Sequence, residues 1–181
     1  MKIFEANVYN LFIITKNMET KNKYSYPVDK EKLRSIITDA PAHKVFRNED
    51  SIFDYTNALD LVCDLDVPVK AALSGEVIYV QEGVTMNWNK PDPPPANIDP
   101  NQNLGNYVII KHKNNELSMY CHQRVGSLKV KVGNKVKTGQ HIGLVGQTGW
   151  STGPHLHFVV YINPKPDKPD VLSLKVRWKE K

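Results

Sequence analysis

Histidines are the residues of this chain best suited to chemistry, and two of its six stand close together. His155 and His157 flank Leu156 directly after a Gly-Pro pair. Side chains two residues apart in a β-strand point to the same face, so both imidazoles would project together while Leu156 and Phe158 enter the core. Two imidazoles on one face suit zinc binding combined with proton transfer. If the His-x-His pattern stood alone, the alternative to a zinc site would be two exposed strand histidines without a chemical function.

Short β-strands are expected to position these histidines. From about residue 58, short apolar runs and tight turns replace a less periodic N-terminal part. The pattern predicts a hairpin of 67–73 with 76–80, and further strands at 107–112, 117–122, 128–132, 141–145, 157–162 and 171–176. We therefore expect a mostly β, antiparallel fold, a β-sandwich or flattened barrel with a groove, preceded by an irregular N-terminal segment.

The sequence pattern divides the chain into three segments. Residues 1–50 form an N-terminal extension, in which 28–37 could make a short helix capped by Asp29, and the apolar stretch 8–15 a first strand or helix. That stretch lacks a small-residue cleavage site, so it is not expected to be a signal peptide. Residues 51–163 form the main domain, and residues 164–181 form a tail with one short strand.

A proline-rich stretch interrupts the strands at about 87–106. It holds five of the chain's 12 prolines, and proline cannot join a central strand because it lacks the backbone donor. We expect an exposed surface loop here. A cleft rim or a partner-binding segment is the functional alternative.

Composition excludes several classes of protein. The chain has 181 residues, of which 40% are hydrophobic and 24% charged, so it can bury a core. No run of about 18 apolar residues predicts a membrane span, and two cysteines cannot make a disulfide scaffold or a four-cysteine zinc site. The net charge of +5 comes from basic residues that alternate with apolar ones, which is typical of solvated strand faces and not of a nucleic-acid surface. We expect a monomer.

Several motifs follow one another in a fixed order. They occupy 58–61, 68–77, 106–112, 119–122, 130–143 and 146–158. This order resembles the lysostaphin-like, or LytM-type, zinc metallopeptidases over roughly residues 57–162, with the proline-rich loop as an insertion. The resemblance implies an antiparallel β fold with a groove, a Zn²⁺ cofactor, and hydrolysis of peptide bonds in the stem or cross-bridge peptides of peptidoglycan. Location in the cell envelope or outside the cell would follow if the chain is exported.

The resemblance also implies roles for individual residues. Asp60 and His157 match the family's metal ligands, and His122 and His155 match its two catalytic histidines. His112 matches a position that we interpret as structural. The family motif also requires a histidine four residues before Asp60, where this chain has Thr56.

Thr56 weakens the expected zinc site because a neutral hydroxyl is a poor zinc ligand. His43 could replace the missing ligand if the segment between it and Asp60 folds over the groove, and Asp54 could do so if 54–60 is extended. The simpler interpretation makes His43 a surface-loop residue and Asp54 a turn carboxylate. Thr56 therefore favours an alternative function, a catalytically degenerate relative that acts as a cell-wall binding or regulatory module.

Cys121 precedes His122, and a cysteine–histidine pair could in principle act as a nucleophile. Strand alternation should send the two side chains to opposite faces. We therefore expect Cys121 to fill the core.

Overall fold

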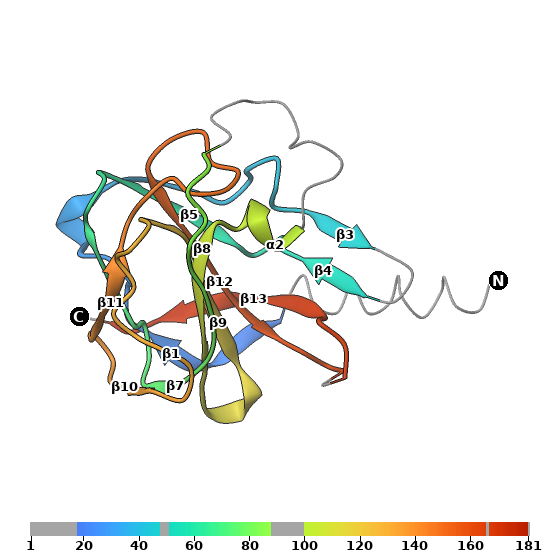
Figure 1. Ribbon diagram of the computed structural model, residues 1–181. Coiled ribbons are helices and arrows are strands. Elements are labelled where there is room, and N and C mark those ends of the chain that lie inside the picture. The colour runs from blue at the N-terminus through green and yellow to red at the C-terminus, as the bar shows by residue number, and fades with distance from the viewer. Residues whose placement is uncertain (1–17, 48–50, 88–99, 166, 181) are drawn as a thin grey trace.

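The structure of the chain is a computed structural model that describes residues 18–47, 51–87, 100–165 and 167–180 (Figure 1). The expected strand or helix at 8–15 and most of the proline-rich loop lie outside these residues. The described residues contain three short helical turns, η1 (Lys30–Lys32), α2 (Pro100–Asn103) and η2 (Lys113–Asn115). The rest of the regular structure is β.

Thirteen strands are found in the described part of the chain. They are β1 (Glu19–Tyr24), β2 (Leu33–Ile37), β3 (Val45–Arg47), β4 (Ile52–Asp54), β5 (Leu59–Cys63), β6 (Pro68–Lys70), β7 (Gly75–Gln81), β8 (Asn106–Lys111), β9 (Leu117–Gln123), β10 (Lys135–Val136), β11 (His141–Leu144), β12 (His155–Ile162) and β13 (Val171–Trp178). Eleven of them form one large sheet, and β6 and β11 form a two-stranded sheet. The mostly β prediction is confirmed.

The large sheet runs in the order β10-β7-β8-β9-β12-β13-β4-β3. Most pairs are antiparallel, but β13 pairs in parallel with both β1 and β4, so the sheet is mixed and does not close into a barrel. Strand β12 lies at its centre (Figure 1). The first half of β12 pairs with β5 and its second half with β13, while β9 pairs along its other edge.

Several local predictions from the sequence are wrong. The predicted hairpin of 67–73 with 76–80 does not form, because β6 pairs with β11 and β7 pairs with β8 and β10. The predicted helix at 28–37 is a single 3-10 turn followed by strand β2, which pairs with β5 through a ladder with one irregularity. No strand forms at 128–132. In these cases pairing with distant strands overrides the local pattern.

Two hydrophobic clusters lie on opposite faces of the central strands. Leu156 and Phe158 of β12 are fully buried in the larger cluster, as the alternation predicted. Val159 and Tyr161 belong to the second cluster, on the other face. His157 has the same parity in β12 as Val159, so it points to the face of the second cluster. The core thus fixes the direction of this histidine.

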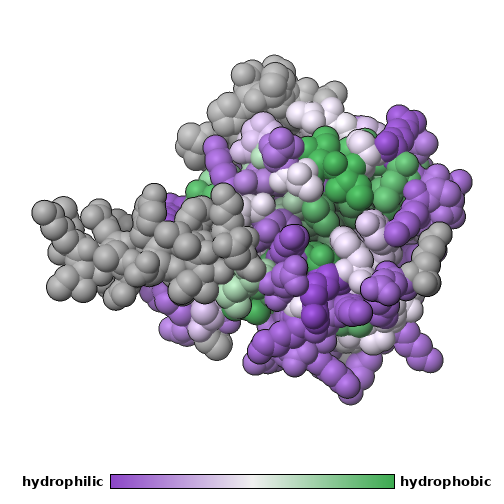
Figure 2. Space-filling view, turned by 180° about the vertical axis from the view of Figure 1, so that it is seen from behind, coloured by the Kyte–Doolittle hydropathy of each residue, from purple (hydrophilic) through white to green (hydrophobic). Residues whose placement is uncertain are grey.

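The surface carries both polar and apolar residues. Figure 2 shows the face opposite to that of Figure 1, where a patch of hydrophobic residues is surrounded by hydrophilic ones. Large hydrophobic side chains that are exposed include Ile36 and Ile37 of β2 and Leu65 after β5. Among the described residues, no helix has the length and apolar character needed to cross a membrane.

Candidate active site

Asp60 lies at the centre of a group of histidines. It stands directly opposite His157 in the ladder between β5 and β12, which places both side chains on one face. His157 Nδ1 lies 2.9 Å from Asp60 Oδ1. His155, two residues earlier on β12, has its Nε2 3.6 Å from the same oxygen. The prediction that His155 and His157 project together is confirmed.

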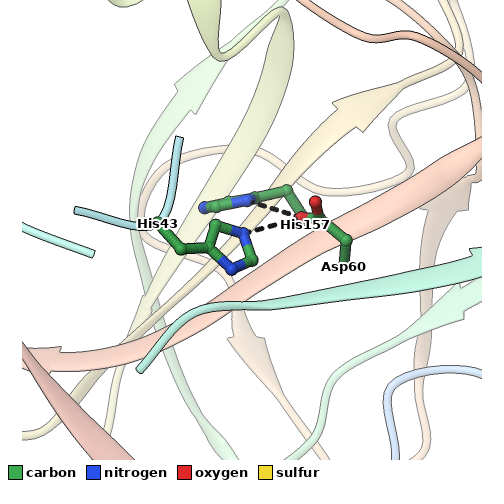
Figure 3. A group of neighbouring side chains, drawn as sticks. All are labelled: His43, Asp60 and His157. Atoms are coloured by element: carbon green, nitrogen blue, oxygen red, sulfur yellow. Dashed lines mark hydrogen bonds and ion pairs between the residues drawn. The ribbon is translucent and has the colours of Figure 1, made fainter. Parts of the chain in front are cut away.

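His43 joins this group from the connection between β2 and β3. Its Nε2 lies 3.1 Å from Asp60 Oδ1, and its side chain has no exposed surface. Its ring contacts that of His157 edge-on, with 5.1 Å between the centroids. Figure 3 shows both rings directed at the Asp60 carboxylate. The expectation that His43 is a surface-loop residue is wrong, because the segment before β3 folds back over β5.

Thr56 and Asp54 interact with each other instead of joining the histidines. The backbone N–H and the hydroxyl of Thr56 donate to Asp54 Oδ1 at 2.9 and 2.7 Å. Asp54 is buried, and Ser173 Oγ also donates to it. Asp54 therefore acts as the turn carboxylate that the simpler interpretation expected, and it does not replace the missing histidine.

The residues around Asp60 fit a divalent metal ion. His43, Asp60 and His157 offer ligand atoms that all lie within 4.8 Å of one another. His43 Nδ1 lies 3.2 Å from the carbonyl of Thr38. Because a carbonyl only accepts, Nδ1 carries the hydrogen in the neutral ring, and the Nε2 lone pair then faces the carboxylate. Two acceptors that face each other need a cation between them, either a proton or a metal.

Two further observations agree with this fit. His157 Nε2 is buried and has no hydrogen-bond partner among the described residues, so the protein does not satisfy this ring by itself. Two histidines and one carboxylate are also a donor set typical of catalytic zinc sites, which keep three protein ligands and one open position.

Burial and charge set the protonation of the group. Burial by itself raises the pKa of Asp60, but its contacts with His157 and His43 outweigh this effect and hold the pKa well below its usual value. Burial lowers the pKa of His43, yet its contact with the Asp60 carboxylate leaves that pKa above the ordinary one. Asp60 therefore stays anionic and attracts cationic partners.

His122 and His155 make a second pair beside the first group. Their ring centroids are 4.7 Å apart, and the His122 ring is 5.9 Å from that of His157. Burial, reinforced by the neighbouring histidines, lowers the pKa of His122 well below its usual value. Burial also lowers the pKa of His155, although the charge of Asp60 opposes it. Both rings are therefore neutral near pH 7 and can accept a proton.

Backbone carbonyls orient these two rings. His122 Nδ1 donates to the carbonyl of Thr148 at 2.8 Å, and His155 Nδ1 donates to the carbonyl of Gly153 at 2.9 Å. Each Nε2 is left as the acceptor. The sequence did not indicate a role for Thr148 or Gly153, because they orient the histidines through backbone carbonyls, which every residue type has.

His122 reaches this site through an unusual backbone conformation. Its φ is +61°, a region that residues other than glycine seldom adopt. Cys121 stands opposite His157 in the ladder between β9 and β12 and so lies on the same face as that histidine. The expectation that strand alternation sends the Cys121 and His122 side chains to opposite faces is therefore wrong, because the His122 ring also lies beside His157. Cys121 is nevertheless fully buried in the second hydrophobic cluster, and burial raises the pKa of its thiol well above the usual value.

His112 and His141 lie outside the group around Asp60. His112 is buried, with its Nδ1 3.0 Å from the carbonyl of Ser74 and its Nε2 2.7 Å from Ser118 Oγ. These contacts agree with the structural role expected for His112. One residue that the sequence analysis did not consider is Tyr55, whose ring lies edge-on to that of His157 with 5.9 Å between the centroids.

Comparison with known proteins agrees with the geometry. The sequence profile of peptidase family M23 matches residues 54–169. The chain is 47% identical over 62 residues to the peptidoglycan DD-endopeptidase ShyA of Vibrio cholerae, a match that covers 34% of this chain and 14% of ShyA. It is 33% identical over 110 residues to ShyB, another peptidoglycan DD-endopeptidase of that species, covering 61% of this chain and 21% of ShyB. The chain thus matches less than a quarter of the length of either relative.

A solved structure supports the same relationship. The crystal structure of a zinc-containing peptidase from Vibrio cholerae superposes with a TM-score of 0.51 and 29% sequence identity. The superposition covers 77% of this chain and 36% of that one.

Proposed function

Because the chain belongs to peptidase family M23, we propose that it is a zinc-dependent endopeptidase that hydrolyses peptide bonds in the stem or cross-bridge peptides of peptidoglycan. The observation that carries the proposal is the position of His43. It supplies the third ligand atom beside Asp60 and His157, where Thr56 had left the family's motif incomplete. The relatives named as peptidoglycan DD-endopeptidases support the choice of substrate.

In this proposal His43, Asp60 and His157 hold the zinc ion. When bound, zinc would supply Lewis-acid polarisation of the scissile carbonyl and would lower the pKa of a water molecule. His122 and His155 would orient this water, take its proton at Nε2, and steady the developing oxyanion once protonated. The carbonyls of Thr148 and Gly153 support these roles because they keep each Nε2 free of a hydrogen.

The position of His43 also bears on the domains. Residues 51–163 are proposed as the peptidase domain, but one of its proposed ligands lies in the extension 1–50. Strand β2 of that extension pairs with β5, the strand that carries Asp60. We therefore propose that the extension completes the catalytic domain.

The alternative of a degenerate binding module rested on Thr56 alone. With His43 beside Asp60, the missing motif histidine no longer argues against zinc binding. A module that only binds cell wall has no chemical need for His122 and His155 at this position. The endopeptidase is therefore the better-supported function.

Metal analysis and substrate digestion test the proposal together. Protein purified without chelator should contain about one zinc ion per chain and should release soluble peptides from purified peptidoglycan. A chelator should abolish this release, and added zinc should restore it. Protein that holds no zinc and, after zinc addition, cleaves neither peptidoglycan nor glycine-rich peptides would contradict the endopeptidase. Retention of such inactive protein on insoluble peptidoglycan would then favour the binding module.

A further inference from the structure

A hollow of about 420 Å³ opens beside the proposed catalytic histidines. Thr148 lines it, and the carbonyl of this same residue accepts the hydrogen bond from His122. The other lining residues are Leu65, Asp66, Thr85, Asn87, Arg124, Val125, Gly146 and Gln147. Thr148 therefore links the hollow to the hydrogen bond that orients His122, one of the two proposed catalytic histidines.

Close backbone contacts hold the walls of this hollow in place. A Cβ on Gly146 would lie 2.4 Å from the backbone nitrogen of Arg124, so only glycine lets these two segments touch. The backbone N–H of Asp66 donates to the carbonyl of Val145, and that of Arg124 donates to the carbonyl of Leu144. The two walls that carry Asp66 and Arg124 are thus fixed to the same segment before Gly146.

One charged pair stands among the polar and apolar lining residues. Arg124 Nη1 donates to Asp66 Oδ1 at 2.6 Å, and both side chains are about half exposed, at 55% and 52%. Asp66 lies in the turn between β5 and β6, with a φ of +68°, and its backbone N–H is bonded to Val145. A guanidinium has five N–H donors in a planar fork, and the bond to Asp66 engages only one of its nitrogens. The remaining donors can bind a second carboxylate.

We propose that Arg124, oriented by Asp66, binds a carboxylate of the peptide substrate in this hollow, beside the scissile bond. A guanidinium fork matches a carboxylate with two parallel hydrogen bonds, which a lysine cannot do. Two amide side chains indicate that the carboxylate belongs to a peptide. Asn87 and Gln147 line the hollow and are hydrogen-bonded to each other at 2.8 Å, and amide groups suit the backbone of a peptide. The identity of the ligand as a substrate rests on the proposed endopeptidase function.

The carboxylate can come from a peptide C-terminus or from an acidic side chain, so the test uses three peptides. Each is a fluorescently labelled Ala-Gly peptide with a ketomethylene group in place of the central peptide bond, which prevents cleavage. One ends in a free carboxylate, one carries a glutamate and ends in a carboxamide, and one carries a glutamine and ends in a carboxamide. Fluorescence polarisation measures the Kd of each peptide for the zinc-loaded protein.

We expect one or both carboxylate peptides to bind about fivefold more tightly than the neutral peptide, the scale of a partly exposed ion pair. Arg124→Gln should remove this preference, and Arg124→Lys should keep only part of it. Arg34→Gln is the matched control, because Arg34 forms an ion pair with Asp64 that is also more than half exposed, and Arg34 does not line the hollow. The Arg34→Gln variant should prefer carboxylate peptides over the neutral peptide by the same factor as the wild type.

Equal affinity of the wild type for all three peptides, including no measurable binding of any, would overturn the proposal. So would a preference that survives in Arg124→Gln or disappears in Arg34→Gln. The hydrolysable versions of the peptides separate this inference from the proposed function. Carboxylate binding through Arg124 without cleavage of any peptide contradicts the endopeptidase alone, whereas equal cleavage and equal binding of all three contradict only the carboxylate site.

Discussion

His43 Nε2 lies 3.1 Å from Asp60 Oδ1, although 17 residues separate the two along the chain. The contact joins the β2–β3 connection to the central sheet. It gives Asp60 a second imidazole within hydrogen-bonding distance, beside His157, where the sequence motif has Thr56.

Replacing His43 should remove most of the zinc affinity. Loss of a residue that merely supports a metal ligand costs about 10–100-fold in affinity, and loss of a ligand should cost more. We expect His43→Ala to weaken zinc binding by at least ~100-fold, measured by competition with a chromophoric chelator. His141→Ala is the control, because His141 lies outside the group around Asp60 and its Nε2 contacts the carbonyl of Gly143 in the same strand. Wild-type affinity in His43→Ala would show that this residue is no ligand.

Zinc should also order the segment that carries His43. The segment 38–44 reaches Asp60 through the buried His43 ring, and Lys44 beside it is exposed. A ligand present at ten times its Kd lowers the population of the open form about elevenfold. Trypsin cleavage after Lys44 should therefore slow about tenfold when zinc is added to metal-free protein.

Cleavage after Lys137 supplies the internal control for this experiment. Lys137 is exposed in a turn before β11 and does not belong to the group around Asp60. Its cleavage rate should not change with zinc, and mass spectrometry distinguishes the two fragments. Equal protection of both sites would indicate a global effect on stability, and no protection of Lys44 would show that zinc does not hold this segment.

The fold class could be predicted from the sequence, but the strand pairing could not. The alternation in β12 predicted buried Leu156 and Phe158 because one face of this strand packs into the larger cluster. The sequence around residues 67–80 predicted a hairpin, whereas β6 pairs with β11, more than 60 residues away. Local turn residues do not report such long-range pairing, which depends on packing in the completed sheet.

The site was predictable where it follows one strand and not where it depends on loops. His155 and His157 could be placed on one face because a strand has a fixed period. His43 could not be assigned, because its position depends on the path of the segment between β2 and β3 and not on any spacing to Asp60. His122 departs from strand alternation through its positive φ, which the residue type does not reveal.

Replacing His122 should lower catalysis without removing the metal. A positioned general base contributes about 10²–10⁴-fold to the rate, so His122→Asn should lower kcat on a peptide substrate by that factor while zinc content stays at the wild-type level. Asparagine suits the positive φ of +61° better than alanine does, so His122→Asn should also unfold at a higher temperature than His122→Ala. A kcat within threefold of the wild type in both variants would exclude His122 as the base.

His112 should make the folded protein sensitive to acid. Burial lowers the pKa of His112 below its ordinary value of 6.5, and the hydrogen bond to Ser74 offsets this only in part. The unfolded chain therefore takes up a proton first as the pH falls, so the stabilisation is complete above about pH 6.5 and is lost progressively below it. The free energy of unfolding should fall by up to about 1.4 kcal/mol between pH 7.5 and 5.5 because of this residue.

Urea unfolding of zinc-loaded protein at these two pH values measures the effect. His112→Asn keeps a donor for the Ser74 carbonyl but cannot be protonated, so its free energy of unfolding should fall by about 1 kcal/mol less than that of the wild type over this range. Acid also displaces zinc, but it does so in both proteins, and the difference between them isolates His112. An equal fall in His112→Asn and the wild type would show that His112 is already protonated, or free to become so, in the folded state.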